Sequence, residues 1–238
     1  MYRATERVVL VAALLLAGCA AETIIDSTET WESGLSGVVK KPIVFDAQRH
    51  QLSLQYLQDR YGIERKEPTI VPKVVVVHWT AIPTLDATFD AFDPPVLPGA
   101  RKEISSAGAL NVSSQYLVDR DGTIYQLLPE TTMARHTIGL NHVAIGIENV
   151  GNGTDLPLTN AQLVSNAAII RYLSGKYQLE YLIGHYEYTR FERHTLWKEK
   201  DAAYRTEKTD PGEGFMRRLR ALVADLNLQG PPAPASTN

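Results

Sequence analysis

The chain has 238 residues, of which 44% are hydrophobic and 21% are charged, and this balance excludes a disordered, collagen-like or coiled-coil protein. The formal charge of −3, from 24 Lys and Arg against 27 Asp and Glu, argues against a nucleic-acid binder, which needs a basic excess to neutralise phosphates. The single cysteine excludes a disulfide framework within the chain.

The first 18 residues predict a cleaved secretory signal peptide. Arg3 and Arg7 supply a basic start, and residues 8–17 form an uninterrupted apolar run. At 1.5 Å per residue this run covers only about half of a ~30 Å hydrocarbon core, so a signal peptide fits better than a membrane span. The run ends in LAGC at residues 16–19, which resembles the bacterial lipobox.

The lipobox resemblance implies a lipid on Cys19, and Ala20 behind it implies the periplasmic face of the outer membrane. An ordinary signal peptide with a chance cysteine is the alternative. Residues 19–40 are rich in Ser, Thr, Gly and Glu, which predicts a lipidated N-terminus and a flexible spacer. The tail 229–238 is rich in Pro, Ala and Ser and is predicted to be disordered. Residues 41–228 between them predict a single domain.

Helical and strand patterns alternate through this domain. The patterns predict, in chain order, a helix over 47–60, a buried strand over 74–77, a helix over 85–92, a hairpin of strands 114–118 and 124–128 around Arg120-Asp121-Gly122, a strand over 144–149, a helix from the capping box Thr159-x-x-Gln162 to about 177, a strand over 181–183 and a helix over 215–226. Strands mixed with helices predict an α/β or α+β fold with a central mixed β-sheet flanked by helices.

Polar residues stand at the ends of the predicted strands or just beyond them. They are His78, Glu148 and His185, followed by Lys208 and Asp210 before the last helix. Two histidines and one aspartate are donors that zinc accepts at about 2.0–2.2 Å, with a fourth position left for water. A lone histidine at a strand end is more often structural, so the spacing by itself leaves both interpretations open.

Five segments resemble the successive blocks of one family. They are VVVVHWTA (74–81), SSQYLVDRDGTIYQLLPE (113–130), ARHTIGLNHVAIGIENVG (134–151), LIGH (182–185) and KTDPG (208–212). Together they resemble the zinc-dependent N-acetylmuramoyl-L-alanine amidases, the amidase-2 family that includes AmpD-like enzymes and shares its fold with peptidoglycan recognition proteins. The resemblance implies hydrolysis of the amide between N-acetylmuramic acid and L-alanine in peptidoglycan or muropeptides.

Carried over by position, the resemblance implies that three residues bind Zn²⁺: His78, His185 and Asp210. It implies that Glu148 transfers protons as the catalytic acid and that Lys208 stabilises the oxyanion. His136 matches a histidine that lines the family's substrate groove.

One stretch departs from the family pattern. Residues 186–207 are longer than the connection usual in AmpD-like members, and His194 within them competes with His185 as the second ligand. We favour His185 because it directly follows a predicted strand. The aromatic residues of the stretch are candidates for one wall of the substrate groove.

Two other functions compete with the amidase. The same fold serves as a non-catalytic peptidoglycan receptor when the ligand set is incomplete, and a zinc peptidase on stem peptides would keep the metal but cut another bond. The complete ligand set, with Glu148 and Lys208, favours the amidase. We expect peptidoglycan or muropeptides as substrate, a membrane contact through the lipid on Cys19, no nucleic-acid partner, and a monomer.

Overall fold

The computed structural model describes residues 35–99 and 102–233. The chain separates into two units, residues 1–32 and 33–238, and the described residues belong to the second. The predicted signal peptide, the lipid site at Cys19 and most of the spacer lie outside the described residues. Within the described part, every helix is too short or too polar to span a membrane.

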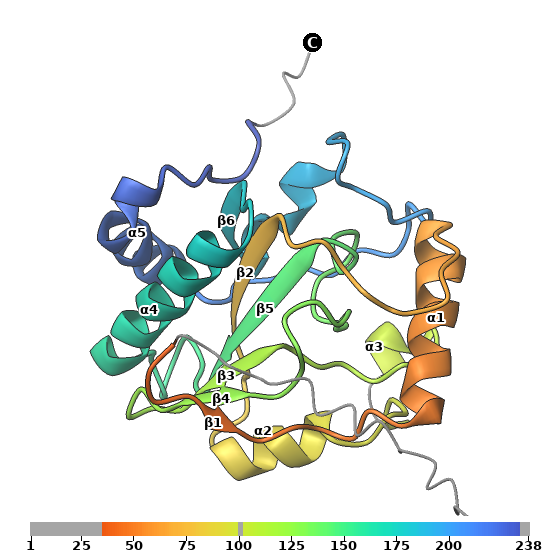
Figure 1. The fold of residues 1–238 in the computed structure, drawn as a ribbon, viewed down its shortest axis with the longest axis horizontal. Helices are drawn as coiled ribbons and strands as arrows, with labels where there is room; N and C mark the ends of the chain where they lie inside the picture. The colour runs from red at the N-terminus through yellow and green to blue at the C-terminus, as the bar shows by residue number, and fades with distance from the viewer. Residues whose placement is uncertain (1–34, 100–101, 234–238) are drawn as a thin grey trace, which may run out of the picture. The chain divides into compact units, whose positions relative to one another are not determined.

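Within residues 35–99 and 102–233, six strands form one mixed sheet in the order β1-β4-β3-β5-β2-β6 (Figure 1). They are β1 (Val39–Lys40), β2 (Val74–Trp79), β3 (Tyr116–Val118), β4 (Ile124–Gln126), β5 (Ala144–Asn149) and β6 (Tyr181–Gly184). Among these strands β3 and β4 pair antiparallel, whereas the other neighbouring pairs are parallel. The sheet confirms the predicted mixed α/β architecture.

Five α-helices and two short 3₁₀ helices surround the described sheet. They are α1 (Ala47–Tyr61), α2 (Leu85–Phe92), α3 (Lys102–Ser105), α4 (Asn160–Lys176) and α5 (Glu213–Leu222), with η1 (His185–Phe191) and η2 (Ala224–Leu226). Helix α4 begins with the predicted capping box, in which Thr159 and Gln162 exchange side-chain-to-backbone hydrogen bonds.

The two faces of the sheet are covered differently. Helices α4 and α5 lie side by side, and their apolar residues join Val75 and Val77 in one core (Figure 1). Val74 and Val76, whose side chains point the other way, belong to a separate cluster. That cluster takes its other members from residues 140–144, from β6 and from η1. His78 follows in the same alternation, so it lies on the face that loops cover.

The ordered sheet extends slightly beyond the predicted domain limits. Val39 and Lys40, the end of the predicted spacer, form β1 beside β4. Gln229, the start of the predicted tail, continues along β6, where its carbonyl accepts from the Leu182 N–H at 2.9 Å. Pairing of this kind uses backbone groups and leaves no side-chain pattern in the sequence.

The last predicted helix is shorter than expected. Helix α5 ends at Leu222, and the 3₁₀ turn η2 takes up the remaining residues of the predicted segment.

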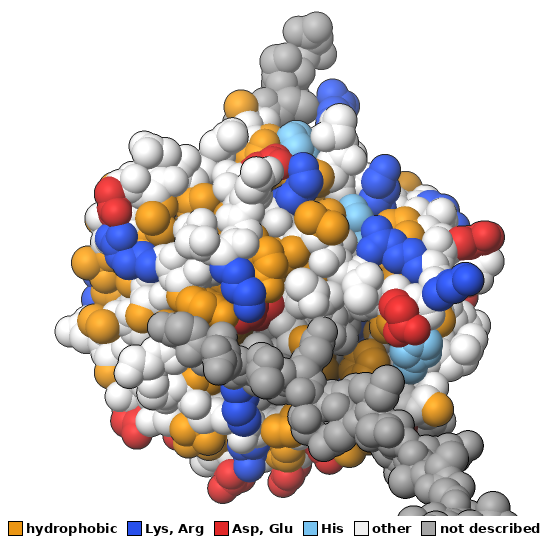
Figure 2. Space-filling view, viewed as in Figure 1, with side chains coloured by type: hydrophobic (Ala, Val, Ile, Leu, Met, Phe, Trp, Pro, Cys, Tyr) orange, Lys and Arg blue, Asp and Glu red, His pale blue; other side chains and the backbone are white. Residues whose placement is uncertain are grey.

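Figure 2 shows one face of the molecule, on which acidic and basic side chains are mixed among apolar and neutral ones.

Candidate metal centre and active-site cavity

Three neighbouring strands deliver three candidate residues to one edge of the sheet. His78 in β2 is the register partner of Glu148 in β5. On the other side of β2, Val77 pairs with Gly184, so His185 comes directly after the end of β6. Parallel neighbours in register point their side chains to the same face, so the sheet itself brings these residues together.

Asp210 reaches the same place from the segment before α5. Its carbonyl oxygen accepts a hydrogen bond from the Tyr186 N–H at 3.0 Å, which ties it to the first turn of η1. A second hydrogen bond, from the Gly212 N–H to the Thr209 carbonyl at 2.9 Å, closes the turn around it. The aspartate is therefore fixed beside His185, the first residue of η1.

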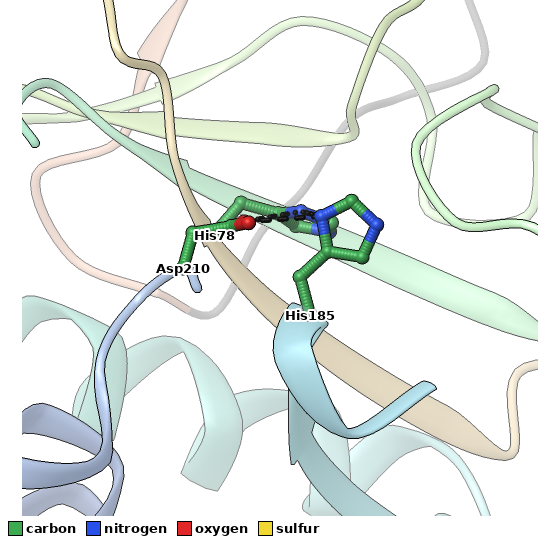
Figure 3. A group of neighbouring side chains, drawn as sticks. All are labelled: His78, His185 and Asp210. Atoms are coloured by element: carbon green, nitrogen blue, oxygen red, sulfur yellow. Dashed lines mark hydrogen bonds and ion pairs between the residues drawn. The ribbon is translucent and has the colours of Figure 1, made fainter. Parts of the chain in front are cut away.

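The three side chains converge on one point (Figure 3). The Nδ1 atoms of His78 and His185 are 2.9 Å apart, and Oδ2 of Asp210 lies 3.2 Å from the first and 3.1 Å from the second. Donors that surround a tetrahedral zinc ion at about 2.0–2.2 Å lie about 3.3 Å from one another. Two nitrogens and one carboxylate oxygen at these separations fit a zinc ion in both chemistry and spacing.

Burial and neighbouring side chains together set the charges of His78 and Asp210. Burial, with help from the neighbouring His185, lowers the pKa of His78 to about 4. Burial alone would raise the pKa of Asp210, but the imidazoles of His185 and His78 hold it well below its usual range. At neutral pH His78 is therefore neutral and Asp210 is ionised, which are the forms in which each side chain binds a metal.

The donors open into a cavity of about 510 Å³ that Glu148 and Lys208 also line. Glu148 is half-buried beside His78, and Lys208 is half-buried two residues before Asp210. The cavity thus holds a carboxylate and an ammonium next to the cluster of donors. A carboxylate can move a proton, and an ammonium can stabilise a developing oxyanion.

His136 lines the cavity and contacts His78 at Nε2, the ring nitrogen that does not belong to the donor cluster. Its Nδ1 lies 3.1 Å from Nε2 of His78, and the two rings are nearly perpendicular. The loop that carries it is held by Asn141, whose Oδ1 accepts from the backbone N–H groups of His136 at 3.0 Å and Thr137 at 2.7 Å. Burial, with His78 adding to it, lowers the pKa of His136 well below its usual range.

His194 lies elsewhere. Its Nε2 is 3.2 Å from the hydroxyl of Tyr181, and its Nδ1 accepts from the Leu196 N–H at 3.3 Å. The structure therefore brings His185, and not His194, to His78 and Asp210.

The long stretch 186–207 has two parts. Its end contributes Tyr204 and Thr206 to the cavity wall. Its middle packs on the loop of His136, where the Lys198 N–H donates to the Gly139 carbonyl at 3.1 Å. A Cβ on Gly139 would lie 2.5 Å from the ring of Trp197, so glycine leaves room for this contact. The stretch thus supplies part of the wall and braces the loop behind the cluster.

Sequence reasoning missed several residues of the cavity wall. Ile104 and Val112 come from separate segments and carry no motif, whereas Tyr204 is one of the aromatic residues of the stretch 186–207 that were predicted for the wall. Arg135, beside His136, donates to the backbone carbonyl of Ile104 at 2.6 Å and to the hydroxyl of Tyr204 at 3.3 Å. The sequence pointed to Arg135 only through its position in the segment 134–151, which resembles a block of the amidase-2 family.

The chain matches known proteins over this region. Residues 65–213 match the family model described as N-acetylmuramoyl-L-alanine amidase. The 1,6-anhydro-N-acetylmuramyl-L-alanine amidase AmpD of Salmonella typhimurium strain LT2 is 31% identical over 171 residues, which cover 64% of this chain and 81% of that protein.

Solved structures are also similar to this chain. The endolysin amidase LysCS from Clostridium intestinale URNW is 22% identical with a TM-score of 0.48, and the match covers 83% of this chain and 99% of that one. The amidase AmiD from E. coli, in complex with anhydro-N-acetylmuramic acid-L-Ala-D-gamma-Glu-L-Lys, is 22% identical with a TM-score of 0.43 over 70% of this chain and 61% of that one.

Proposed function

Because the chain belongs to the N-acetylmuramoyl-L-alanine amidase family, with AmpD among its relatives, we propose that it hydrolyses the muramoyl–L-alanine amide with a zinc ion held by His78, His185 and Asp210. The observation that carries the proposal is the convergence of these three donors in the lining of a cavity that Glu148 and Lys208 also line. Peptidoglycan or its muropeptide fragments are the substrates that this bond implies.

The residues divide the chemistry among them. A zinc ion held by these three donors would lower the pKa of a bound water to about 7 and would polarise a carbonyl. Glu148 takes a proton from the attacking water and later delivers it to the L-alanine nitrogen, while the carbon–nitrogen bond breaks and a carbon–oxygen bond forms. Lys208 donates to the lactyl carbonyl oxygen as negative charge develops there. The products are the lactyl carboxylate of the sugar and a stem peptide with a free amine.

The proposed location follows from the first residues of the chain. The sequence up to Cys19 resembles a lipoprotein signal, and Ala20 behind the cysteine supports retention at the outer membrane. A lipid anchor there would hold the amidase on the periplasmic face, beside peptidoglycan. Acyl chains contribute about 0.8 kcal/mol per buried CH₂, so more than one chain anchors a protein durably.

Mass spectrometry of defined muropeptides tests the proposal. The chain from Ala20 onward is incubated with muropeptides as purified, after a chelator, and after zinc is restored. The proposal predicts an intact stem peptide and a free lactyl sugar, loss of both with the chelator, and recovery with zinc. Shortened stem peptides would identify a peptidase instead. Muropeptide that binds without being cut, at any zinc level, would identify a receptor.

A further inference from the structure

The two ring nitrogens of His78 face different partners. Its Nδ1 belongs to the donor cluster, whereas its Nε2 lies 3.1 Å from Nδ1 of His136 and 3.5 Å from the hydroxyl oxygen of Thr137. A neutral imidazole that binds a metal through Nδ1 must carry its proton on Nε2. The partner of Nε2 therefore decides whether Nδ1 presents a lone pair to the metal.

A competing interaction favours the opposite tautomer. Oδ2 of Asp210 is 3.2 Å from Nδ1 of His78, and a carboxylate attracts a proton to the nitrogen that it faces. In the metal-free protein this contact would place the proton on Nδ1, where it blocks the metal. A hydrogen-bond acceptor on the other side of the ring would favour the tautomer with the proton on Nε2.

The backbone fixes the tautomer of His136. Its Nε2 lies 3.3 Å from the carbonyl oxygen of Ala144, which can only accept a hydrogen bond, so Nε2 of His136 carries the proton. Nδ1 of His136 is then an acceptor. The Thr137 hydroxyl lies 2.8 Å from the same Nδ1 and 3.5 Å from Nε2 of His78; when it donates to Nδ1 it shares that lone pair with His78, and Nδ1 of His136 stays an acceptor.

We infer that His136 is a positioning residue that accepts the Nε2 proton of His78 and thereby holds the Nδ1 lone pair of His78 toward the zinc site. The chain of contacts runs from Nδ1 of His78 through its Nε2–H to Nδ1 of His136, and from Nε2–H of His136 to the Ala144 carbonyl. This role rests on the proposed zinc site and differs from the substrate contact that the family resemblance implies for His136.

The sequence makes room for this contact at Gly146 in β5. A Cβ there would lie 2.9 Å from Cγ of His136, closer than real side chains approach. Gly146 does not have a positive φ, so the backbone does not require glycine; the space does. The missing side chain lets the His136 ring lie against the sheet beside His78.

Nuclear magnetic resonance of the metal-free full-length protein tests the inference without using activity. With ¹⁵N-labelled histidine, the ring nitrogens of His78 report the tautomer directly. The wild type is expected to carry its proton on Nε2. In His136→Leu, which removes the acceptor, the proton is expected to move to Nδ1, toward Asp210.

Zinc affinity, measured by competition with a chelator, gives the second readout. Loss of a hydrogen-bond partner behind a ligand weakens metal binding about 10–100-fold, which we expect for His136→Leu. His136→Asn keeps an acceptor in the place of Nδ1 and should restore most of the affinity. His142→Leu is the matched control, because His142 is a buried histidine of the same loop and contacts the ring of Tyr61 instead of the cluster.

The outcomes separate this inference from the proposed function. A wild-type His78 with its proton on Nδ1 would overturn the inference, and so would a folded His136→Leu protein with wild-type zinc affinity. Equal losses of zinc affinity in His136→Leu and His142→Leu would show that His136 has only a structural role, and this result would also overturn the inference. A wild type that binds no zinc would contradict the proposed function, while the tautomer of the metal-free protein would still decide the role of His136.

Discussion

The candidate site has two parts that are held in different ways. One part, called the strand half, lies in the strands β2 and β5, and the other, called the segment half, lies in the segment before α5. His78 and Glu148 lie in β2 and β5, where the backbone ladder on both sides sets their register. Lys208 and Asp210 lie in the segment before α5, where a hydrogen bond from Tyr186 fixes the aspartate. The difference indicates that the backbone ladder of the sheet positions His78 and Glu148, whereas the segment before α5 adds the Asp210 carboxylate and the Lys208 ammonium.

The strongest test of this comparison removes one donor from the segment. Asp210→Ala leaves two nitrogen donors, so we expect zinc to be lost and muropeptide hydrolysis to fall to background. His185→Ala should behave in the same way, and His194→Ala should keep both zinc and activity. Metal content and hydrolysis are measured on each purified protein. Zinc retained by His185→Ala but lost by His194→Ala would contradict the ligand assignment.

The next test removes the proposed proton carrier of the strand half, Glu148, and leaves the three metal donors intact. Glu148→Gln keeps the shape of the side chain but cannot take a proton from water. We expect kcat to fall about 10²–10⁴-fold, the usual contribution of a positioned acid–base group, while zinc content and Tm stay unchanged. A variant with near wild-type kcat would exclude Glu148 as the proton carrier.

A smaller loss is expected from the other residue of the segment half. Lys208→Met removes the positive charge and keeps most of the side-chain volume. Loss of one oxyanion-stabilising group costs about 10²–10³-fold in kcat, and zinc should remain bound. If zinc were lost as well, Lys208 would be needed to place Asp210 and would not act through its charge alone.

Sequence patterns predicted most of the sheet and helices because strong local signals mark them. The β-branched run of β2, the hairpin turn at Gly122 and the capping box at Thr159 all lie where they were expected. The strand β1 and the pairing of Gln229 were not predicted, because backbone groups at a sheet edge pair without a side-chain signature.

The site could be predicted as far as it lies at strand ends. The position of polar residues at the ends of predicted strands, together with the family resemblance, selected His78 and His185. The contact between His78 and His136 was not predictable, because it depends on how the loop after β4 returns to the sheet. Gly146 likewise looks like an ordinary strand glycine until the ring that occupies its space is known.

Acid should destabilise the metal-free protein through buried histidines of this region. Burial lowers the pKa of His78 and of His142 from 6.5 to about 4. Between these values the unfolded chain binds protons that the folded chain does not, so the free energy of unfolding falls as pH falls from about 6.5 to about 4. Each group contributes about 1.4 kcal/mol per pH unit within that window.

Asp210 adds slope only toward the lower end of this window, because its folded pKa lies below its ordinary value of 3.8 and the unfolded chain alone begins to bind that proton as pH approaches 4. Urea unfolding at a series of pH values measures the effect. His142→Asn should remove about one proton from the slope, because His142 lies outside the donor cluster and titrates separately. An unchanged slope in that variant would show that His142 is not held neutral by burial.

The smallest effect is expected on the opposite face of the sheet. Thr159→Ala removes the cap of α4, whose hydroxyl accepts from the Gln162 N–H at 3.1 Å. Loss of such a cap costs about 1 kcal/mol of stability. Thermal unfolding should show a lower Tm with zinc content and kcat unchanged, and Thr159→Ser should restore the Tm. A change in kcat would mean that the two faces are coupled.

Anomalous X-ray scattering at the zinc edge, on crystals of the active protein, tests the central claim most directly. We predict one strong peak within about 2.0–2.2 Å of Nδ1 of His78, Nδ1 of His185 and Oδ2 of Asp210. A peak at His194, a peak bonded to Nε2 of His78, or no peak in a protein that hydrolyses muropeptides would contradict it.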